Sequence, residues 1–160
     1  MTNKVNPIPD GFHTITPYLC IKDAARAIEF YKKAFGATEV MRLVDPTNGK
    51  IGHAQIQIGA SMVMLADEFP EMGILSPQSL GGSPVSISLF VEDVDALASQ
   101  AIAAGAKVLG PVADQFWGER SGKFEDPFGH IWLIQTRTEE VSPEEMQRRY
   151  DDFMKQDGPA

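Results

Sequence analysis

The sequence has little of what several common kinds of site require. Among its 160 residues there are one cysteine, Cys20, and three histidines, His13, His53 and His130. A single cysteine excludes a disulfide within the chain and a cysteine-rich zinc site. It suits a reducing compartment, and we expect a cytoplasmic protein. Three histidines on three separate segments form no metal-binding motif.

Basic residues and long apolar runs are also scarce. Fourteen Lys and Arg stand against twenty-two Asp and Glu, so the formal net charge is −8. Nucleic acid and anionic membrane surfaces repel an acidic chain, and we expect neither as a partner. No apolar run approaches the roughly 18 residues of a membrane-spanning helix, and the first residues show no signal-peptide pattern.

What the sequence does contain is an internal repeat. The stretch 19–28 resembles the stretch 89–98, because each reads as a strand, an aspartate and an alanine-rich helix. The aspartates, Asp23 and Asp93, are good helix N-caps. A Gly-Ala pair ends each helix, and glycine readily adopts the left-handed conformation found there.

Three short strands are predicted after each helix, so each half reads β-α-β-β-β. We therefore expect an α+β fold of two βαβββ modules, over residues 12–74 and 84–137, which together form one domain. A stretch rich in Gly, Ser and Pro (75–84) is the predicted linker. The predicted strands after the helices are 39–44, 52–58 and 61–66 in the first module and 107–109, 122–125 and 130–136 in the second.

A separate helix is predicted over residues 141–155 at the C-terminal end. Ser142 is a suitable N-cap, and it precedes Pro143 and two glutamates, which favour the first helical turn. An apolar stripe follows at helical spacing. This stripe either packs on its own domain or covers a partner subunit. Its members are Met146, Tyr150, Phe153 and Met154.

Alternation along the strands separates a face that packs on the helix from a face that is free for a ligand. In the strand 52–58, three apolar residues alternate with His53, Gln55 and Gln57. The free faces of the other strands carry Tyr18, Met62, Met64, Ser88 and Phe90. Mixed polar, methionine and aromatic surfaces are typical of small-molecule pockets, and a solvated sheet surface is the alternative.

Three further side chains are candidates for recognition or chemistry. Trp117 and Arg120 lie in a predicted loop, where an aromatic face and a guanidinium would clamp a flat or anionic ligand. The alternatives are a core or interface position for Trp117 and a surface ion pair of Arg120 with Glu119 or Glu125. His53 is the candidate for acid–base chemistry, and a structural, hydrogen-bonded histidine is its alternative.

These features together resemble the vicinal oxygen chelate superfamily, which includes glyoxalases, bleomycin resistance proteins and dioxygenases. The Asp-Pro-Phe-Gly-His segment at 126–130, the paired modules and the Gly-Ala helix ends carry the resemblance over residues 12–137. The segments 14–19, 52–59 and 115–122 resemble the PhnB-like branch. The resemblance implies sheets that curl around a cavity, which is usually completed in a homodimer and sometimes involves exchanged strands.

The resemblance also implies where a metal would sit. Metal-using members place His, Glu or Gln at four cavity positions, which here fall near Thr16, Met64, Ser86 and Leu133. None of these residues is a good ligand for a divalent metal. We therefore assign no metal ligands and no cofactor.

Our main interpretation is a homodimer that binds a small organic molecule without metal chemistry. The residues expected to line the cavity are Tyr18, His53, Gln55, Met62, Met64, Ser88, Phe90, Trp117 and Arg120. One alternative is a metal-dependent lyase, isomerase or dioxygenase of the same superfamily, with His53 as ligand or general base. Another is a protein–protein module that uses the C-terminal helix. Whether the protein is an enzyme stays open at this point.

Overall fold

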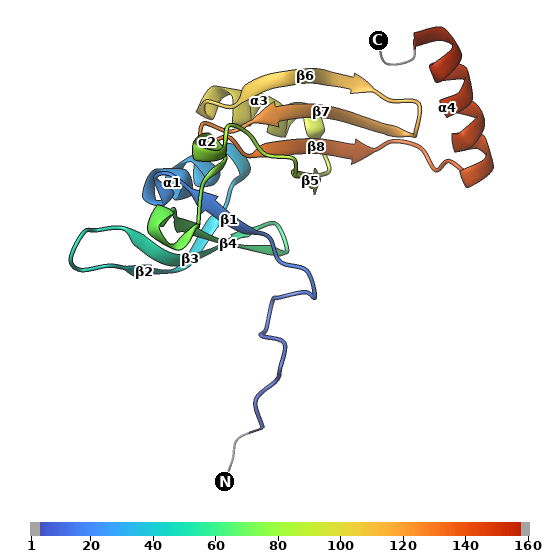
Figure 1. Ribbon diagram of the computed structural model, residues 1–160. Helices are drawn as coiled ribbons and strands as arrows, with labels where there is room; N and C mark the ends of the chain where they lie inside the picture. The colour runs from blue at the N-terminus through green and yellow to red at the C-terminus, as the bar shows by residue number, and fades with distance from the viewer. Residues whose placement is uncertain (1–3, 158–160) are drawn as a thin grey trace.

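The computed structural model describes residues 4–157 and contains two four-stranded sheets, each with a helix on one face (Figure 1). Sheet 1 has the strand order β1-β4-β3-β2, and sheet 2 has the order β5-β8-β7-β6. The two predicted βαβββ modules are thereby confirmed. The elements of the first are β1 (Tyr18–Ile21), α1 (Ala24–Phe35), β2 (Thr38–Val44), β3 (Ile51–Ile58) and β4 (Ser61–Asp67). Those of the second are β5 (Ser86–Phe90), α3 (Val94–Ala104), β6 (Lys107–Asp114), β7 (Glu119–Glu125) and β8 (Ile131–Arg137).

The helix ends follow the local sequence. The Asp23 carboxylate accepts a hydrogen bond from the backbone N–H of Arg26, and that of Asp93 accepts one from Ala96. Gly36 ends α1 in the left-handed region, with φ of 66°. Both cap predictions are confirmed, because a cap depends on residues within one turn of the helix end.

The second hairpin is longer than predicted. Strand β6 continues to Asp114 and β7 begins at Glu119, whereas the sequence predicted 107–109 and 122–125. Ala113 pairs with Ser121 across this extension. Gly110 and Pro111 interrupt the local strand pattern, and the ladder continues past them by a shift in register.

The segment between the modules is not an irregular linker throughout, because it contains two short helical turns. It contains a 3-10 turn, η1 (Pro70–Met72), and a one-turn helix, α2 (Pro77–Leu80). Ser76 caps α2 and is fully buried. The Glu68 carboxylate accepts hydrogen bonds from the Ser76 backbone and the Ser79 hydroxyl, and hydrogen bonds from these two serines lower the pKa of Glu68 to about 2.

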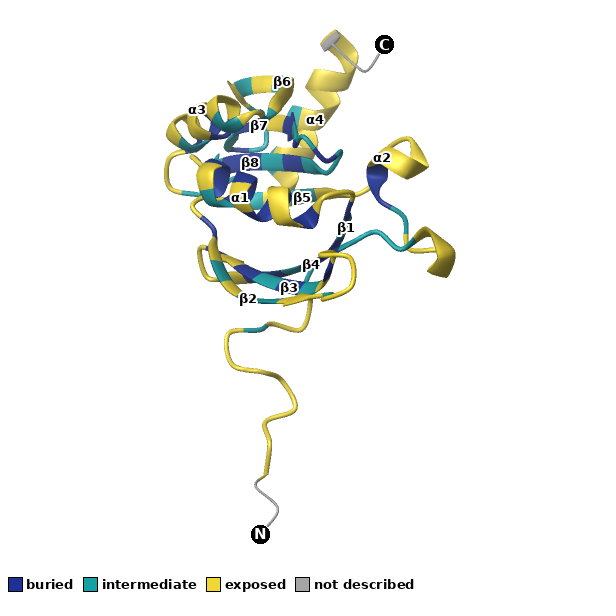
Figure 2. Ribbon diagram, turned by 90° about the vertical axis from the view of Figure 1, so that its left-hand side faces the viewer, coloured by how far each residue is buried: buried dark blue, intermediate teal, exposed yellow. Residues whose placement is uncertain are grey.

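Helix α1 lies in the angle between the two sheets and joins their cores. Figure 2 shows sheet 2 standing above sheet 1, with α1 on the inner side of both. Tyr31 of α1 packs 5.5 Å from the Trp132 ring of β8, measured between ring centroids. One continuous core therefore includes residues of both modules. The inner faces converge on α1, and the outer faces of the two sheets consequently diverge.

The predicted C-terminal helix is present as α4 (Pro143–Asp157). It extends away from the end of sheet 2 (Figure 1). Phe116 packs against its apolar stripe, with ring centroids 6.0 Å from Tyr150 and 5.3 Å from Phe153. The stripe therefore contacts its own domain, while its four members remain 36–46% exposed. Among residues 4–157, no helix is long and apolar enough to cross a membrane.

Candidate functional site

A chain of three polar side chains crosses the outer face of sheet 1. The Tyr18 hydroxyl lies 2.8 Å from Nδ1 of His53, and Nε2 of His53 lies 3.1 Å from Nε2 of Gln55. Tyr18 comes from β1, while His53 and Gln55 come from β3. The alternation that buries Ala54 and Ile56 on the inner face places these three on the outer one.

The donor and acceptor roles along these hydrogen bonds leave the Tyr18 hydroxyl proton free. The Gln55 nitrogen is only a donor, so the contact at 3.1 Å assigns Nε2 of His53 as acceptor and its Nδ1–H as the donor to Tyr18. The Tyr18 hydroxyl then has its own hydrogen available for a ligand. Partial burial, followed by the nearby Cys20, raises the pKa of Tyr18, so the hydroxyl remains a donor at neutral pH.

Methionine lies beside this polar chain. Met64 of β4 is the register partner of both Tyr18 and Gln55, so it shares their face and is half-buried. Met62, two residues earlier, is buried and offers less surface to a ligand. Cys20 is also on this side, and burial raises the pKa of its thiol, with Glu68 contributing next. The thiol is therefore neutral and is a poor nucleophile here.

A groove of about 570 Å³ separates the edges of β1 and β5. Two predicted ligand-binding residues from different modules, Tyr18 and Ser88, both line this groove. His130 lies at its side, with Nε2 3.0 Å from the Cys20 carbonyl oxygen. Phe90 lies farther along β5 and is 65% exposed. The structure thus brings Ser88 near Tyr18 and leaves Phe90 outside the groove.

Trp117 and Arg120 lie on opposite sides of sheet 2. Arg120 faces α3, and its guanidinium bonds Asp95 of that helix at 2.8 Å and Asp114 of β6 at 3.3 Å. Both partners raise its pKa, Asp95 more than Asp114. Trp117 instead lines a hollow on the outer face. The predicted clamp of Trp117 and Arg120 does not form in this geometry. Arg120 lies within β7 and not in a loop, and strand alternation turns its side chain to the inner face, away from Trp117.

The hollow beside Trp117 contains polar residues that the sequence analysis did not single out. It has a volume of about 290 Å³ and lies over β7 and β8. Ser121 and Gln135 are register partners there. Extending the predicted strand 122–125 back to Glu119 would have assigned Ser121 to the outer face. The residues that line the hollow are Gly110, Pro111, Gln115, Trp117, Ser121, Gly122, Lys123, Leu133 and Gln135.

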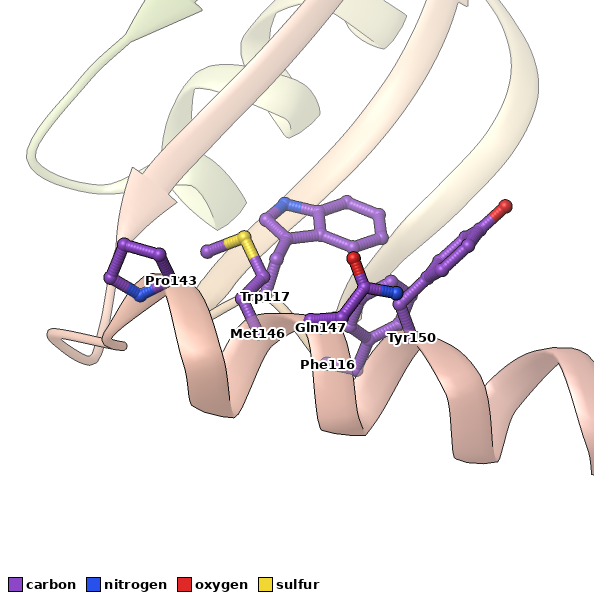
Figure 3. A pocket seen from close by; sticks show the side chains of 6 residues that line it. All are labelled: Phe116, Trp117, Pro143, Met146, Gln147 and Tyr150. Carbon is purple, nitrogen blue, oxygen red and sulfur yellow. The ribbon is translucent and has the colours of Figure 1, made fainter.

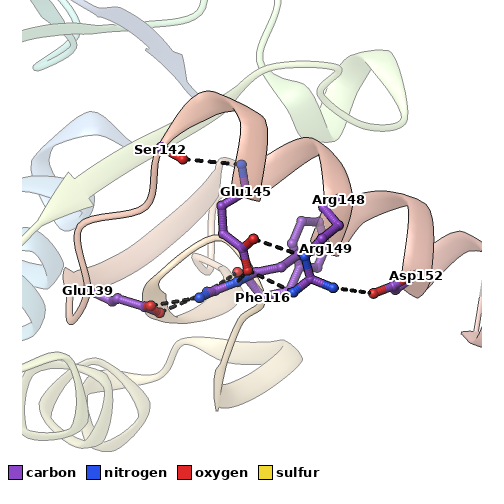
Figure 4. A network of polar contacts seen from close by, with 7 residues as sticks. All are labelled: Phe116, Glu139, Ser142, Glu145, Arg148, Arg149 and Asp152. Atoms are coloured by element: carbon purple, nitrogen blue, oxygen red, sulfur yellow. Dashed lines mark hydrogen bonds and ion pairs between the residues drawn. The ribbon is translucent and has the colours of Figure 1, made fainter.

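Trp117 also borders a second hollow, of about 550 Å³, between its loop and α4 (Figure 3). Met146, Gln147 and Tyr150 of α4 form the other wall. Arg149 fastens this helix, because its guanidinium donates to Glu139 and to the Phe116 carbonyl oxygen (Figure 4). The aromatic loop 116–117 is therefore held between sheet 2 and α4.

The residues at the family's metal positions do not fit a metal centre. Met64 and Leu133 project from β4 and β8 on the outer faces, while Thr16 precedes β1 and Ser86 begins β5. A thioether, an aliphatic side chain and two hydroxyls lack the nitrogen, carboxylate or thiolate ligands that divalent metals take in proteins. Within residues 4–157, no three His, Cys, Asp or Glu side chains are grouped to hold a metal.

Comparison with known proteins assigns the chain to a family. Residues 11–134 match the family model of the Glyoxalase/Bleomycin resistance protein/Dioxygenase superfamily, and the chain belongs to this superfamily. An uncharacterised protein of Mycobacterium tuberculosis is 46% identical over 136 residues, which cover 83% of this chain and 79% of that protein.

Solved structures show the same architecture. A protein from Pseudomonas aeruginosa is 27% identical with a TM-score of 0.63, covering 79% of this chain and 99% of that one. TioX from Micromonospora is 25% identical with a TM-score of 0.60, covering 81% and 100%. All of α4 lies beyond the residues matched by the family model, which end at residue 134.

Proposed function

We propose that this protein binds a small, partly aromatic organic molecule on the outer faces of its sheets, without the superfamily's usual metal site. The Tyr18–His53–Gln55 chain is the observation that carries the proposal. It fixes a hydroxyl donor on an accessible surface, next to the adaptable thioether of Met64. Few oriented polar groups on an otherwise apolar wall are what small-molecule sites use.

A catalytic role for His53 gains less support from the geometry. Both ring nitrogens are engaged, one by Tyr18 and one by Gln55. A general base needs a free ring nitrogen within reach of the substrate, and a metal ligand needs a free lone pair. We therefore propose binding as the function and assign His53 the role of orienting Tyr18.

The proposed assembly is a homodimer. The outer faces diverge within one chain, and both carry exposed apolar side chains, such as Leu43 on sheet 1 and Phe90 on sheet 2. A second copy that places its sheet 2 opposite sheet 1 would enclose the ligand and cover these side chains. The sequence segments 14–19, 52–59 and 115–122 support the PhnB-like branch as the subgroup. The free thiol of Cys20 suits a cytoplasmic setting.

The test uses a neutral aromatic amide, 1-naphthamide, whose carbonyl accepts a hydrogen bond. We expect calorimetry to show binding that is unchanged by EDTA, and Tyr18→Phe to weaken it about threefold to tenfold, as the loss of one neutral hydrogen bond should. Tyr150→Phe, on α4, is the matched control and should leave the affinity unchanged. Loss of binding in EDTA, or no effect of Tyr18→Phe, would contradict the proposal.

A further inference from the structure

The hollow on the outer face of sheet 2 offers unused hydrogen-bonding groups. Ser121 and Gln135 are each only 8% exposed, and their side chains make no hydrogen bond within residues 4–157. No buried polar side-chain atom in this part of the chain lacks a partner, so the polar atoms of these two residues must be accessible. They line the hollow, and it is through the hollow that a ligand would reach them.

One positive charge borders these groups. Lys123 is the only charged residue among the nine that line the hollow, and it makes no ion pair with a described residue. It is two residues after Ser121 on β7, so both lie on the outer face. An ammonium, a hydroxyl and an amide N–H are three donors that suit the oxygens of one carboxylate.

An aromatic wall stands next to the donors. The Trp117 indole donates from Nε1 to the Glu119 carboxylate at 2.8 Å, which fixes the ring orientation. This bond also engages Glu119, the acidic residue that precedes Ser121 on the same face of the strand. Leu133, the register partner of Lys123, provides an apolar floor. A flat ring could therefore lie against Trp117 and Leu133 while its acidic group meets Lys123.

We propose that this hollow binds the carboxylate of a small aromatic acid, with Lys123, Ser121 and Gln135 as its hydrogen-bond donors and Trp117 as the stacking surface. The volume of about 290 Å³ suits a molecule of one or two rings. This inference rests on the proposed function, because it assigns the acidic end of that ligand to sheet 2. In the proposed homodimer, sheet 1 of the second copy faces this hollow, and its Tyr18 hydroxyl would then serve a different part of the same ligand.

The test compares 1-naphthoate with 1-naphthamide, which have the same ring system and differ in charge. We expect calorimetry to give a naphthoate affinity about tenfold higher than that of naphthamide, and naphthoate to shift the Trp117 indole N–H signal in NMR spectra. Trp117→Phe identifies this signal, because Trp132 is the only other tryptophan.

Two variants separate the charge of Lys123 from the general charge of the protein. Lys123→Gln should lower the naphthoate affinity about tenfold and leave naphthamide binding unchanged, whereas Lys123→Arg should stay within about threefold of wild type. Lys33→Gln removes the same charge from α1 and should change neither affinity.

The outcomes distinguish this inference from the proposed function. Equal binding of the two compounds would overturn the carboxylate site and leave the proposed function standing. A naphthoate that binds without moving the Trp117 signal would do the same. If neither compound binds the wild-type protein, both proposals fail together.

Discussion

At the scale of single residues, Asp126 makes a buried polar contact that joins the two modules. Its carboxylate accepts hydrogen bonds from the Tyr31 hydroxyl at 2.6 Å and from the Trp132 indole at 2.9 Å. It also accepts from the backbone N–H groups of Phe128 and His130. Burial first, and then the neighbouring Asp126, raises the pKa of Tyr31 well above its usual value, so Tyr31 stays a donor. The Asp-Pro-Phe-Gly-His segment is therefore a structural element, and its aspartate is turned into the core.

We expect Asp126→Asn to lower the free energy of unfolding by about 3 kcal/mol, because an amide nitrogen would face donors that a carboxylate satisfies. Tyr31→Phe should cost less, about 1–2 kcal/mol, since it removes one bond and leaves the other three. Urea unfolding monitored by circular dichroism measures both. Glu125→Gln, one residue away, is the control and should change the stability by less than about 0.5 kcal/mol. If Asp126→Asn behaves like this control, Asp126 does not hold the modules together.

At the scale of elements, α4 is attached to the domain through few contacts. The bonds of Arg149 to Glu139 and to the Phe116 carbonyl oxygen, together with the contacts of the Phe116 ring, connect it to the loop that carries Trp117. Gly118, which follows Trp117, has φ of 88°, and an added Cβ would lie 2.7 Å from Val141. The loop and the segment before α4 are thus packed closely enough to influence each other.

Arg149→Ala should loosen the loop around Trp117 while the core stays intact. We expect greater acrylamide quenching of tryptophan fluorescence, arising from Trp117, because Trp132 is fully buried. The neighbouring Arg148→Ala is the matched control, since the bonds of Arg148 to described residues are with Glu145 and Asp152 on its own helix. Equal quenching in the two variants would show that Arg149 does not fix the loop.

At the scale of the whole molecule, the two outer faces leave apolar side chains in solvent. Leu43, the register partner of His53 on sheet 1, is 57% exposed, and Phe90 on sheet 2 is 65% exposed. Exposed apolar patches of this kind commonly mark protein interfaces. The proposed homodimer interface at Leu43 would lie next to the Tyr18–His53–Gln55 side chains of the proposed ligand site.

We expect light scattering to give the mass of a dimer for the wild-type chain and of a monomer for Leu43→Asp, because burying an unpaired carboxylate at an interface is costly. Ile102→Asp, on the exposed side of α3, should remain dimeric. Deletion of residues 141–160 should also leave a dimer if α4 serves its own domain, whereas a monomeric product would favour the helix as the interface. A monomeric wild-type protein would contradict the homodimer.

The sequence determined the features that depend on neighbours along the chain. The repeat, the caps Asp23 and Asp93, the start of α4 and the polar face of β3 were predictable, because helical turns and strand alternation are local. The same alternation would have placed Arg120 and Ser121 correctly, had the strand been extended back to Glu119. That start was hidden because Gly110 and Pro111 in the partner strand obscure the hairpin's length.

Only the tertiary structure decided how the two sheets are oriented relative to each other. The path of α1 between the sheets, fixed by Tyr31 and Trp132 around Asp126, makes the outer faces diverge instead of curling around one cavity. The joining of Tyr18 to His53, 35 residues apart, likewise required the pairing of β1 and β3 with β4. Both depend on contacts between residues far apart in the chain, whose packing no local pattern in one sequence specifies.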